Sequence, residues 1–154
     1  MSDIQIARVH PLDDGVRPLL ERHFALMRST SPEESCHVMG PEDLVAAETH
    51  LFAASLDGTL VGVGGYQVIE TGHAEIKSMH TVQEARGKGA GRAILDAIFA
   101  SARGQGVTRV SLETGSADDF AAARSLYQAY GFTLCPPFGH YTLDPLSVFM
   151  SREI

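Results

Sequence analysis

Hydrophobic and polar positions follow two periods along this chain, and the switches between them predict its elements. Alternating positions and short apolar runs predict strands at residues 4–9, 51–56, 60–69, 74–82, 107–114, 132–135 and 147–151. Apolar residues at helical spacing predict helices at 13–30, 41–48, 90–102 and 118–130. Residues 31–40 have no clear period and are predicted as a loop or a broken helix. This order predicts a single α/β domain over residues 1–154, with a mixed, mostly antiparallel sheet flanked by helices.

Two local signals shape the predicted sheet. Asp57-Gly58 lies between the second and third strands and is a strong hairpin signal. In the fourth strand, Ala74 and Ile76 share one face, whereas Met79 falls on the opposite parity. A phase slip of this kind predicts a β-bulge, which is often found beside active sites.

The segment between the fourth strand and the third helix reads Arg86-Gly87-Lys88-Gly89-Ala90-Gly91-Arg92. A glycine-rich turn that opens a helix presents unpaired N–H groups at the positive end of the helix dipole, which suits a phosphate. Neither common phosphate motif fits: a P-loop needs Lys and Ser or Thr after its last glycine, and the dinucleotide fingerprint needs a third glycine where Arg92 or Ile94 stands. The turn and its three cations predict a diphosphate site, with a purely structural turn as the alternative.

Composition and charge narrow the function classes. The 154 residues carry a formal net charge of −7, which argues against a nucleic acid or an anionic membrane as the main partner. Cys36 and Cys135 show neither metal nor disulfide spacing, so no metal site is predicted. The chain has no signal-peptide pattern and no apolar run of membrane-spanning length, which predicts a cytoplasmic protein.

The spacing Arg-x-x-Gly-x-Gly, at Arg86, Gly89 and Gly91, resembles the coenzyme A pyrophosphate motif of the GNAT superfamily of N-acetyltransferases. Residues 75–81 resemble the family's fourth strand, and residues 123–127 followed by 131–132 resemble its late Ala-x-x-Leu-Tyr and Gly-Phe segment. The resemblance covers residues 50–135 well, and 112–115 and 137–141 are similar to bacterial members without an assigned substrate. One departure is Phe120, where many members carry an asparagine that contacts pantetheine.

The resemblance implies a GNAT fold and acetyl-coenzyme A (acetyl-CoA) as the acetyl donor. It implies that the pyrophosphate sits on the turn, and that pantetheine pairs with the fourth strand where the fourth and fifth strands separate. The N–H group near Met79 would then polarise the thioester carbonyl. The implied donor site comprises Met79, His80, Thr81, Arg86, Gly87, Lys88, Gly89, Ala90, Gly91 and Arg92.

Acetyl transfer to an amine requires a base, because an ammonium ion has no lone pair. A carboxylate with a raised pKa can take the proton, directly or through water. Glu75 lies eleven positions before Arg86, the spacing at which some family members place their general base. Tyr127 matches the family's general acid, which implies that its phenol protonates the departing thiolate. The sequence leaves three further candidates for the base, namely Glu70, Glu113 and His80.

The main functional prediction is an N-acetyltransferase that transfers acetyl directly to a small-molecule or protein amine. A non-catalytic acyl-CoA-binding module is the alternative, and a phosphotransferase is disfavoured because the P-loop hydroxyl is missing. Cys36 raises a second route through an acetyl-cysteine, although direct transfer needs no such intermediate. Cys36, His37 and Met39 lie where family members shape the acceptor site, and a homodimer is a further expectation from the family.

Overall fold

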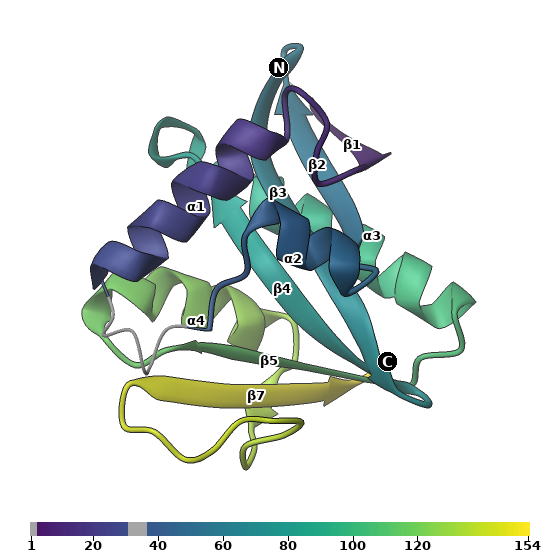
Figure 1. Cartoon of the computed structure of the whole chain (residues 1–154), viewed down its shortest axis with the longest axis vertical. Helices are drawn as coiled ribbons and strands as arrows, with labels where there is room; N and C mark the ends of the chain where they lie inside the picture. Colours follow the sequence, from purple (N-terminus) through teal and green to yellow (C-terminus); the bar gives the residue numbers. More distant parts are fainter. Residues whose placement is uncertain (1–2, 31–36) are drawn as a thin grey trace.

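The computed structural model describes residues 3–30 and 37–154, and it confirms the predicted α/β class (Figure 1). In chain order the elements are β1 (Ile4–Val9), α1 (Arg17–Thr30), α2 (Pro41–Ala46), β2 (His50–Leu56), β3 (Thr59–Glu70), β4 (His73–Thr81), α3 (Ala90–Gly104), β5 (Arg109–Gly115), α4 (Ala121–Ala129), β6 (Thr133–Leu134) and β7 (Ser147–Glu153). They form a seven-stranded sheet of order β1-β2-β3-β4-β5-β7-β6. Only β4 and β5 pair in parallel among these strands; the other neighbours are antiparallel.

Several boundaries differ from the sequence-based expectations. The first helix begins at Arg17, four residues later than predicted, after hydrogen-bonded turns. The second ends at Ala46, and Glu48 takes a φ of 55°, a left-handed conformation that cannot continue a helix. A 3-10 turn over residues 118–120 precedes α4. Of the predicted loop at 31–40, residues 31–36 lie outside the described part of the chain, and 37–40 form no regular element.

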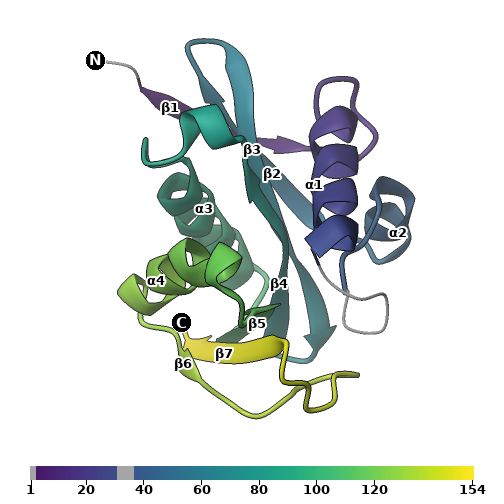
Figure 2. The same cartoon turned by 90° about the vertical axis from the view of Figure 1, so that its left-hand side faces the viewer.

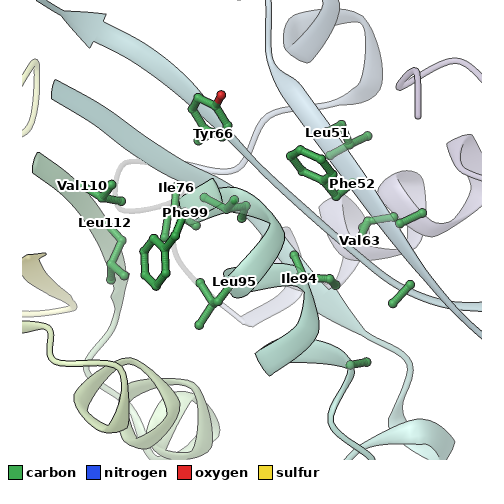
Figure 3. Close-up of a cluster of buried hydrophobic side chains, with 14 of the residues drawn as sticks. Leu51, Phe52, Val63, Tyr66, Ile76, Ile94, Leu95, Phe99, Val110 and Leu112 are labelled. Carbon is green, nitrogen blue, oxygen red and sulfur yellow. The ribbon is translucent and has the colours of Figure 1, made fainter. Parts of the chain in front are cut away.

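Helices cover both faces of the sheet. Figure 2 shows α1 and α2 on one face and α3 and α4 on the other. The apolar side of α3 buries Ile94, Leu95 and Phe99, which join Tyr66 and Ile76 of the sheet in the core (Figure 3). Burial of an apolar side chain of this size contributes about 1.5–3 kcal/mol. The core therefore holds the start of α3, and the glycine-rich turn before it, against β3 and β4.

The predicted β-bulge is present in β4. Two residues of β4, Ser78 and Met79, face the single residue Gly64 of β3, and Ser78 takes a φ of 60°. A Cβ atom on Gly64 would lie 2.3 Å from Met79 Sδ and 2.8 Å from Ile94 Cγ2, so only glycine fits there. The bulge thus turns the Met79 side chain toward α3.

The strands β4 and β5 separate along part of their length. They pair only where residues 73–75 face residues 109–111. Beyond Glu75 and Ser111 both strands continue without pairing to each other, and Figure 1 shows them diverging. Among residues 3–30 and 37–154, the edge of β4 that faces β5 therefore has backbone N–H and C=O groups without a ladder partner, a template for an added strand.

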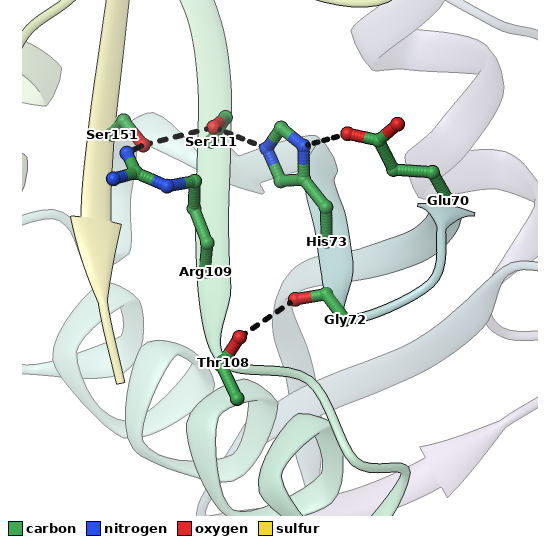
Figure 4. A network of polar contacts seen from close by, with 7 residues as sticks. All are labelled: Glu70, Gly72, His73, Thr108, Arg109, Ser111 and Ser151. Atoms are coloured by element: carbon green, nitrogen blue, oxygen red, sulfur yellow. Dashed lines mark hydrogen bonds and ion pairs between the residues drawn. The ribbon is translucent and has the colours of Figure 1, made fainter.

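A polar network ties the strands together where they begin to separate (Figure 4). His73 contacts Glu70 Oε1 through Nδ1 at 3.1 Å and Ser111 Oγ through Nε2 at 2.6 Å. Ser111 and Arg109 both donate to Ser151 Oγ of β7, at 3.0 and 2.6 Å. The order carboxylate, imidazole, hydroxyl is that of a nucleophilic triad, but Ser111 is only 1% exposed, so no substrate reaches it. The network is a structural tie across β4, β5 and β7.

Candidate active site

The glycine-rich turn is shaped as an anion cradle. Gly87 and Gly89 take φ values of 80° and 92°, which favour glycine, and α3 begins immediately afterwards at Ala90. Its first helical bond runs from the N–H of Ala93 to the carbonyl of Gly89. Within the described chain, the N–H groups of residues 87–92 donate to no backbone acceptor. With the helix dipole, which contributes about 0.3–1 kcal/mol toward an anion at an exposed end, they fit a diphosphate.

A cavity of about 900 Å³ joins this cradle to the gap between β4 and β5. Its wall includes all of residues 75–81 from β4, residues 112–115 from β5, and Leu126 and Tyr127 from α4. His37, Met39, Tyr141 and Leu146 line it as well. We call the part bounded by these loop residues and by Glu75, Lys77 and Glu113 the acceptor end. The structure therefore brings both named catalytic candidates and the implied donor residues except Lys88 to one cavity. Lys88 is exposed on the turn and is not part of the cavity wall.

Tyr127 reaches the cavity from α4. It is 6% exposed and packs edge-on against Phe132, with ring centroids 5.8 Å apart. Burial raises the pKa of Tyr127, and the nearby Glu113 carboxylate raises it further. The phenol is therefore protonated at physiological pH and can donate a proton.

Glu75, the first candidate for the base, contacts Lys77 and Tyr141, and these two residues also contact each other. Its carboxylate accepts a hydrogen bond from the Tyr141 hydroxyl and lies 3.3 Å from Lys77 Nζ. Lys77 Nζ also donates to the Tyr141 oxygen at 2.8 Å. Lys77 is two positions after Glu75 and so shares its side of the strand. The charge of Glu75 is thus balanced by a neighbouring cation.

Glu113 lies on β5, and no salt bridge involves it in residues 3–30 and 37–154. Burial raises the pKa of Glu113 and outweighs three opposing effects, which come from the Ser147 hydroxyl first and then from His37 and Lys77. A partly buried carboxylate with a raised pKa is suited to proton transfer near neutral pH. Glu70, by contrast, is engaged by His73 at the far end of β3 and is not part of the cavity wall.

His80 lies on the opposite side of the sheet from Met79, against α1. Its ring lies 5.1 Å from that of His23, and both are buried. His80 Nε2 and His23 Nδ1 have no hydrogen-bond partner within the described part of the protein. Burial lowers the pKa of His80, and lowers that of His23 to about 4, so both imidazoles are neutral at pH 7. A neutral pair of this kind is packed as part of the interface between α1 and β4.

Two further residues singled out in the sequence are Phe120, which departs from the family pattern, and Cys36, which raised the acetyl-cysteine route. Phe120 lines the cavity and lies over Gly115, where an added Cβ would be 2.2 Å from its ring. It therefore supplies an apolar wall at the position where many family members carry an asparagine. Cys36 lies outside the described residues.

Sequence reasoning missed Lys77 and Tyr141. Tyr141 contacts Glu75 across 66 positions of sequence, from the long connection between β6 and β7. The aromatic and proline-rich character of that connection was a weak signal, because it gave no register against β4. Among residues 3–30 and 37–154, no cluster of three or more potential ligands could hold a metal, and no helix is long and apolar enough to span a membrane.

Comparison with protein families finds a family model that matches most of the chain. The model of the acetyltransferase (GNAT) family matches residues 17–132. The uncharacterized N-acetyltransferase YsnE of Bacillus subtilis (strain 168) is 40% identical over 136 residues, covering 88% of this chain and 90% of that protein. The IAA acetyltransferase of Azospirillum brasilense is 36% identical over 156 aligned residues, covering 100% of each chain.

Solved structures share the same architecture. A crystal structure from Klebsiella pneumoniae subsp. pneumoniae MGH 78578, named for an acyl-CoA N-acyltransferase, superposes with a TM-score of 0.79 at 28% identity, covering 97% of each chain. A GNAT family acetyltransferase of Elizabethkingia anophelis with acetyl-CoA bound has a TM-score of 0.71 at 16% identity, covering 98% of each chain. The latter likeness concerns the fold alone.

Proposed function

We propose that this chain, which belongs to the acetyltransferase (GNAT) family, transfers the acetyl group of acetyl-CoA directly to a primary amine within a ternary complex. As a member of that family it is an acetyl-CoA-dependent N-acetyltransferase. The observation that carries the proposal is the single cavity, which joins an anion cradle to a pair of carboxylates and has Tyr127 in its wall.

The proposed donor site begins at the cradle. The pyrophosphate of acetyl-CoA rests on the N–H groups of residues 87–92, where Arg86, Lys88 and Arg92 add positive charge. Pantetheine lies along the unpaired edge of β4 at Met79, His80 and Thr81, as an added strand. Free donors at the cradle and the early end of β4–β5 pairing support this placement.

The proposed base is one of the two carboxylates at the acceptor end. Glu75 was the first candidate, and Glu113 was one of the alternatives. The contacts favour Glu113, because Lys77 and Tyr141 hold Glu75 as a charge-balanced acceptor while burial raises the pKa of Glu113. We assign the proton transfer to Glu113 and keep Glu75 as the competing assignment.

The proposed reaction has balanced steps. The carboxylate takes a proton from the acceptor ammonium, and the neutral amine attacks the thioester carbonyl carbon. The C–N bond forms and the C–S bond breaks, while Tyr127 gives its proton to the departing thiolate. The second proton leaves the nitrogen for the Tyr127 phenolate, directly or through water, and the protonated carboxylate returns its proton to solvent. The products are the N-acetyl compound and coenzyme A, with one proton released and both side chains restored.

A second candidate activity comes from one relative. The IAA acetyltransferase of Azospirillum brasilense is 36% identical along its whole length, so IAA belongs in any acceptor panel for this chain. Such a panel, with thiol release followed by DTNB, tests the proposed function. We expect release that depends on a primary amine, and calorimetric binding of acetyl-CoA but not of ATP. Binding of acetyl-CoA without thiol release from any amine would contradict the proposal.

A further inference from the structure

The lysine at the acceptor end donates two hydrogen bonds within the protein and forms an ion pair with Glu75. An ammonium group has three N–H donors. Lys77 Nζ has three acceptors within reach, which are the Tyr141 oxygen at 2.8 Å, Glu75 Oε2 at 3.3 Å and the His37 carbonyl at 3.4 Å. The Lys77 side chain is 14% exposed. A ligand would have to displace one of these partners to reach its charge.

Tyr141 is the residue that closes this arrangement. Its hydroxyl accepts from Lys77 and donates to Glu75, which joins the two charges. The ring is fixed by aromatic neighbours, with centroids 5.1 Å from Phe138 and 5.5 Å from Phe149. Burial and the Glu75 carboxylate raise the pKa of Tyr141, so it remains a donor at physiological pH. Tyr141 also lies beyond residues 17–132, outside the match to the family model.

One carboxylate at the acceptor end, that of Glu113, has no ion-pair partner among the described residues. Glu75 and Lys77 compensate each other, whereas Glu113 has no salt bridge within the described chain. The arginines in the cavity wall, Arg86 and Arg92, belong to the cradle. Within residues 3–30 and 37–154, the acceptor end thus offers a carboxylate to an incoming ammonium and no unpaired lysine or arginine to an incoming carboxylate.

We infer that the acceptor is an amine with no carboxylate on the carbon that bears the nitrogen, and that Tyr141 is the positioning residue that imposes this selectivity. The inference rests on the proposed function and refines its acceptor. An α-amino acid held by its nitrogen at Glu113 brings a second negative charge to the same place, and Lys77 is not free to meet it. Alkyl and aryl amines, and peptide N-termini, meet the requirement.

Matched acceptors test the substrate class. We would measure kcat/KM for phenethylamine, phenylalanine and phenylalaninamide, and for isobutylamine, valine and valinamide. Each amide keeps the bulk of the carboxyl group without its charge and also stands for a peptide N-terminus. We expect each amino acid to be at least about tenfold poorer than its amide, since unfavourable charge contacts are an effective source of discrimination. If kcat/KM for an amide is also well below that for its parent amine, the site accepts small amines only. If the two values are equal, the site also accepts peptide N-termini.

The possible failures are distinguishable. If amines are acetylated and an amino acid equals its amide, the proposed function stands and this inference is overturned. If no amine of any kind is acetylated, the proposed function fails, and the inference fails with it.

Variants test the role of Tyr141. The substitution Tyr141→Phe frees a donor of Lys77, so the ratio of kcat/KM for the amino acid to that for its amide should rise at least about threefold. This ratio, taken within one variant, does not change with the fraction of folded enzyme. Tyr66→Phe is the matched control, because its hydroxyl contacts Ser101 Oγ at 2.7 Å on the other side of the sheet and should leave the ratio unchanged.

A second variant guards against a misfolded Tyr141→Phe protein. Glu75→Gln removes the charge that balances Lys77, so the same ratio should rise without disturbing the aromatic packing of Tyr141. If both variants keep the wild-type ratio, Tyr141 does not set the selectivity.

Discussion

At the scale of single residues, environment gives chemically similar side chains different roles. Glu75 and Glu113 are both carboxylates of the cavity wall, but only Glu75 has a cation within 3.3 Å. Tyr127 and Tyr141 are both phenols with raised pKa, yet only Tyr141 is hydrogen-bonded to a carboxylate. This asymmetry is the basis for assigning base, acid and positioning roles to different members of each pair.

The substitution Tyr127→Phe tests the proposed acid. We expect kcat to fall at least about tenfold, because a positioned general acid typically contributes about 10²–10⁴-fold. Calorimetric affinity for acetyl-CoA should stay nearly intact, since the ring and its packing on Phe132 are kept. An unchanged rate in a stopped-flow or DTNB assay would remove Tyr127 from the mechanism.

Glu113→Gln and Glu75→Gln distinguish the two candidate bases through the pH dependence of kcat/KM. Burial raises the pKa of Glu113, and only its ionised form accepts a proton, so wild-type activity should fall as the pH drops through that raised pKa. Glu113→Gln should lose about 100-fold in rate at neutral pH. Glu75→Gln should lose less, under about tenfold in rate at the same pH. The reverse order of the two losses would assign the base to Glu75.

The donor side of the site could be predicted from local sequence motifs. Part of the acceptor side could not, because it depends on contacts between residues far apart in the sequence. The turn at residues 86–92 and Tyr127 could be named because each belongs to a short pattern tied to one element. Lys77 and Tyr141 could not, because their significance depends on how the connection between β6 and β7 folds over the sheet. No local pattern encodes a contact across 66 positions.

At the scale of elements, the bulge and the separation of β4 from β5 create the cavity. The bulge was predictable, because the parity of apolar residues changes within a single strand. The separation of the strands came only from the family resemblance, since pairing depends on residues far apart in sequence. Boundaries such as the start of α4 shifted because a 3-10 turn uses the same acidic start signals as a helix.

Gly64→Ala tests how the bulge shapes the donor site. The new Cβ would lie 2.3 Å from Met79 Sδ, so the methionine must move; overpacking of this kind typically costs about 1–3 kcal/mol. We expect a lower free energy of unfolding in urea and weaker binding of acetyl-CoA. Gly104→Ala is the control: it lies in α3 with no neighbour within 4 Å of the added Cβ, so it should leave acetyl-CoA binding unchanged and should not lower the free energy of unfolding. A Gly64→Ala protein with wild-type stability would contradict the packing described for Met79.

At the scale of the whole molecule, α1 packs on the sheet through core residues such as Leu19 and Leu20, and this interface also buries the contact between His23 and His80. Burial lowers the pKa of His23 from 6.5 to about 4. Between these values the unfolded chain binds more protons than the folded chain, so stability falls as the pH drops from about 6.5 toward 4. The fold class and element order were predictable from sequence, whereas this pairing of α1 with β4 required the assembled structure.

His23→Leu should therefore make the free energy of unfolding less dependent on pH below neutrality. At pH 5 the titration of His23 alone removes about 2 kcal/mol of wild-type stability relative to neutral pH. Between pH 7 and pH 5, the free energy of unfolding should therefore fall by about 2 kcal/mol less in the variant than in the wild type, as measured by urea unfolding. His140→Gln, which changes an exposed histidine, should keep the wild-type dependence. Parallel curves for wild type and His23→Leu would contradict this account.

The central claim is that acetyl passes from acetyl-CoA to an amine without an intermediate on the protein. Intact-mass spectrometry of the enzyme mixed with acetyl-CoA, before and after an amine is added, tests it most directly. We predict no acetylated protein before the amine, and afterwards coenzyme A and N-acetyl product in equal amounts. A protein adduct of one acetyl group that disappears when the amine arrives would contradict direct transfer and support the acetyl-cysteine route through Cys36.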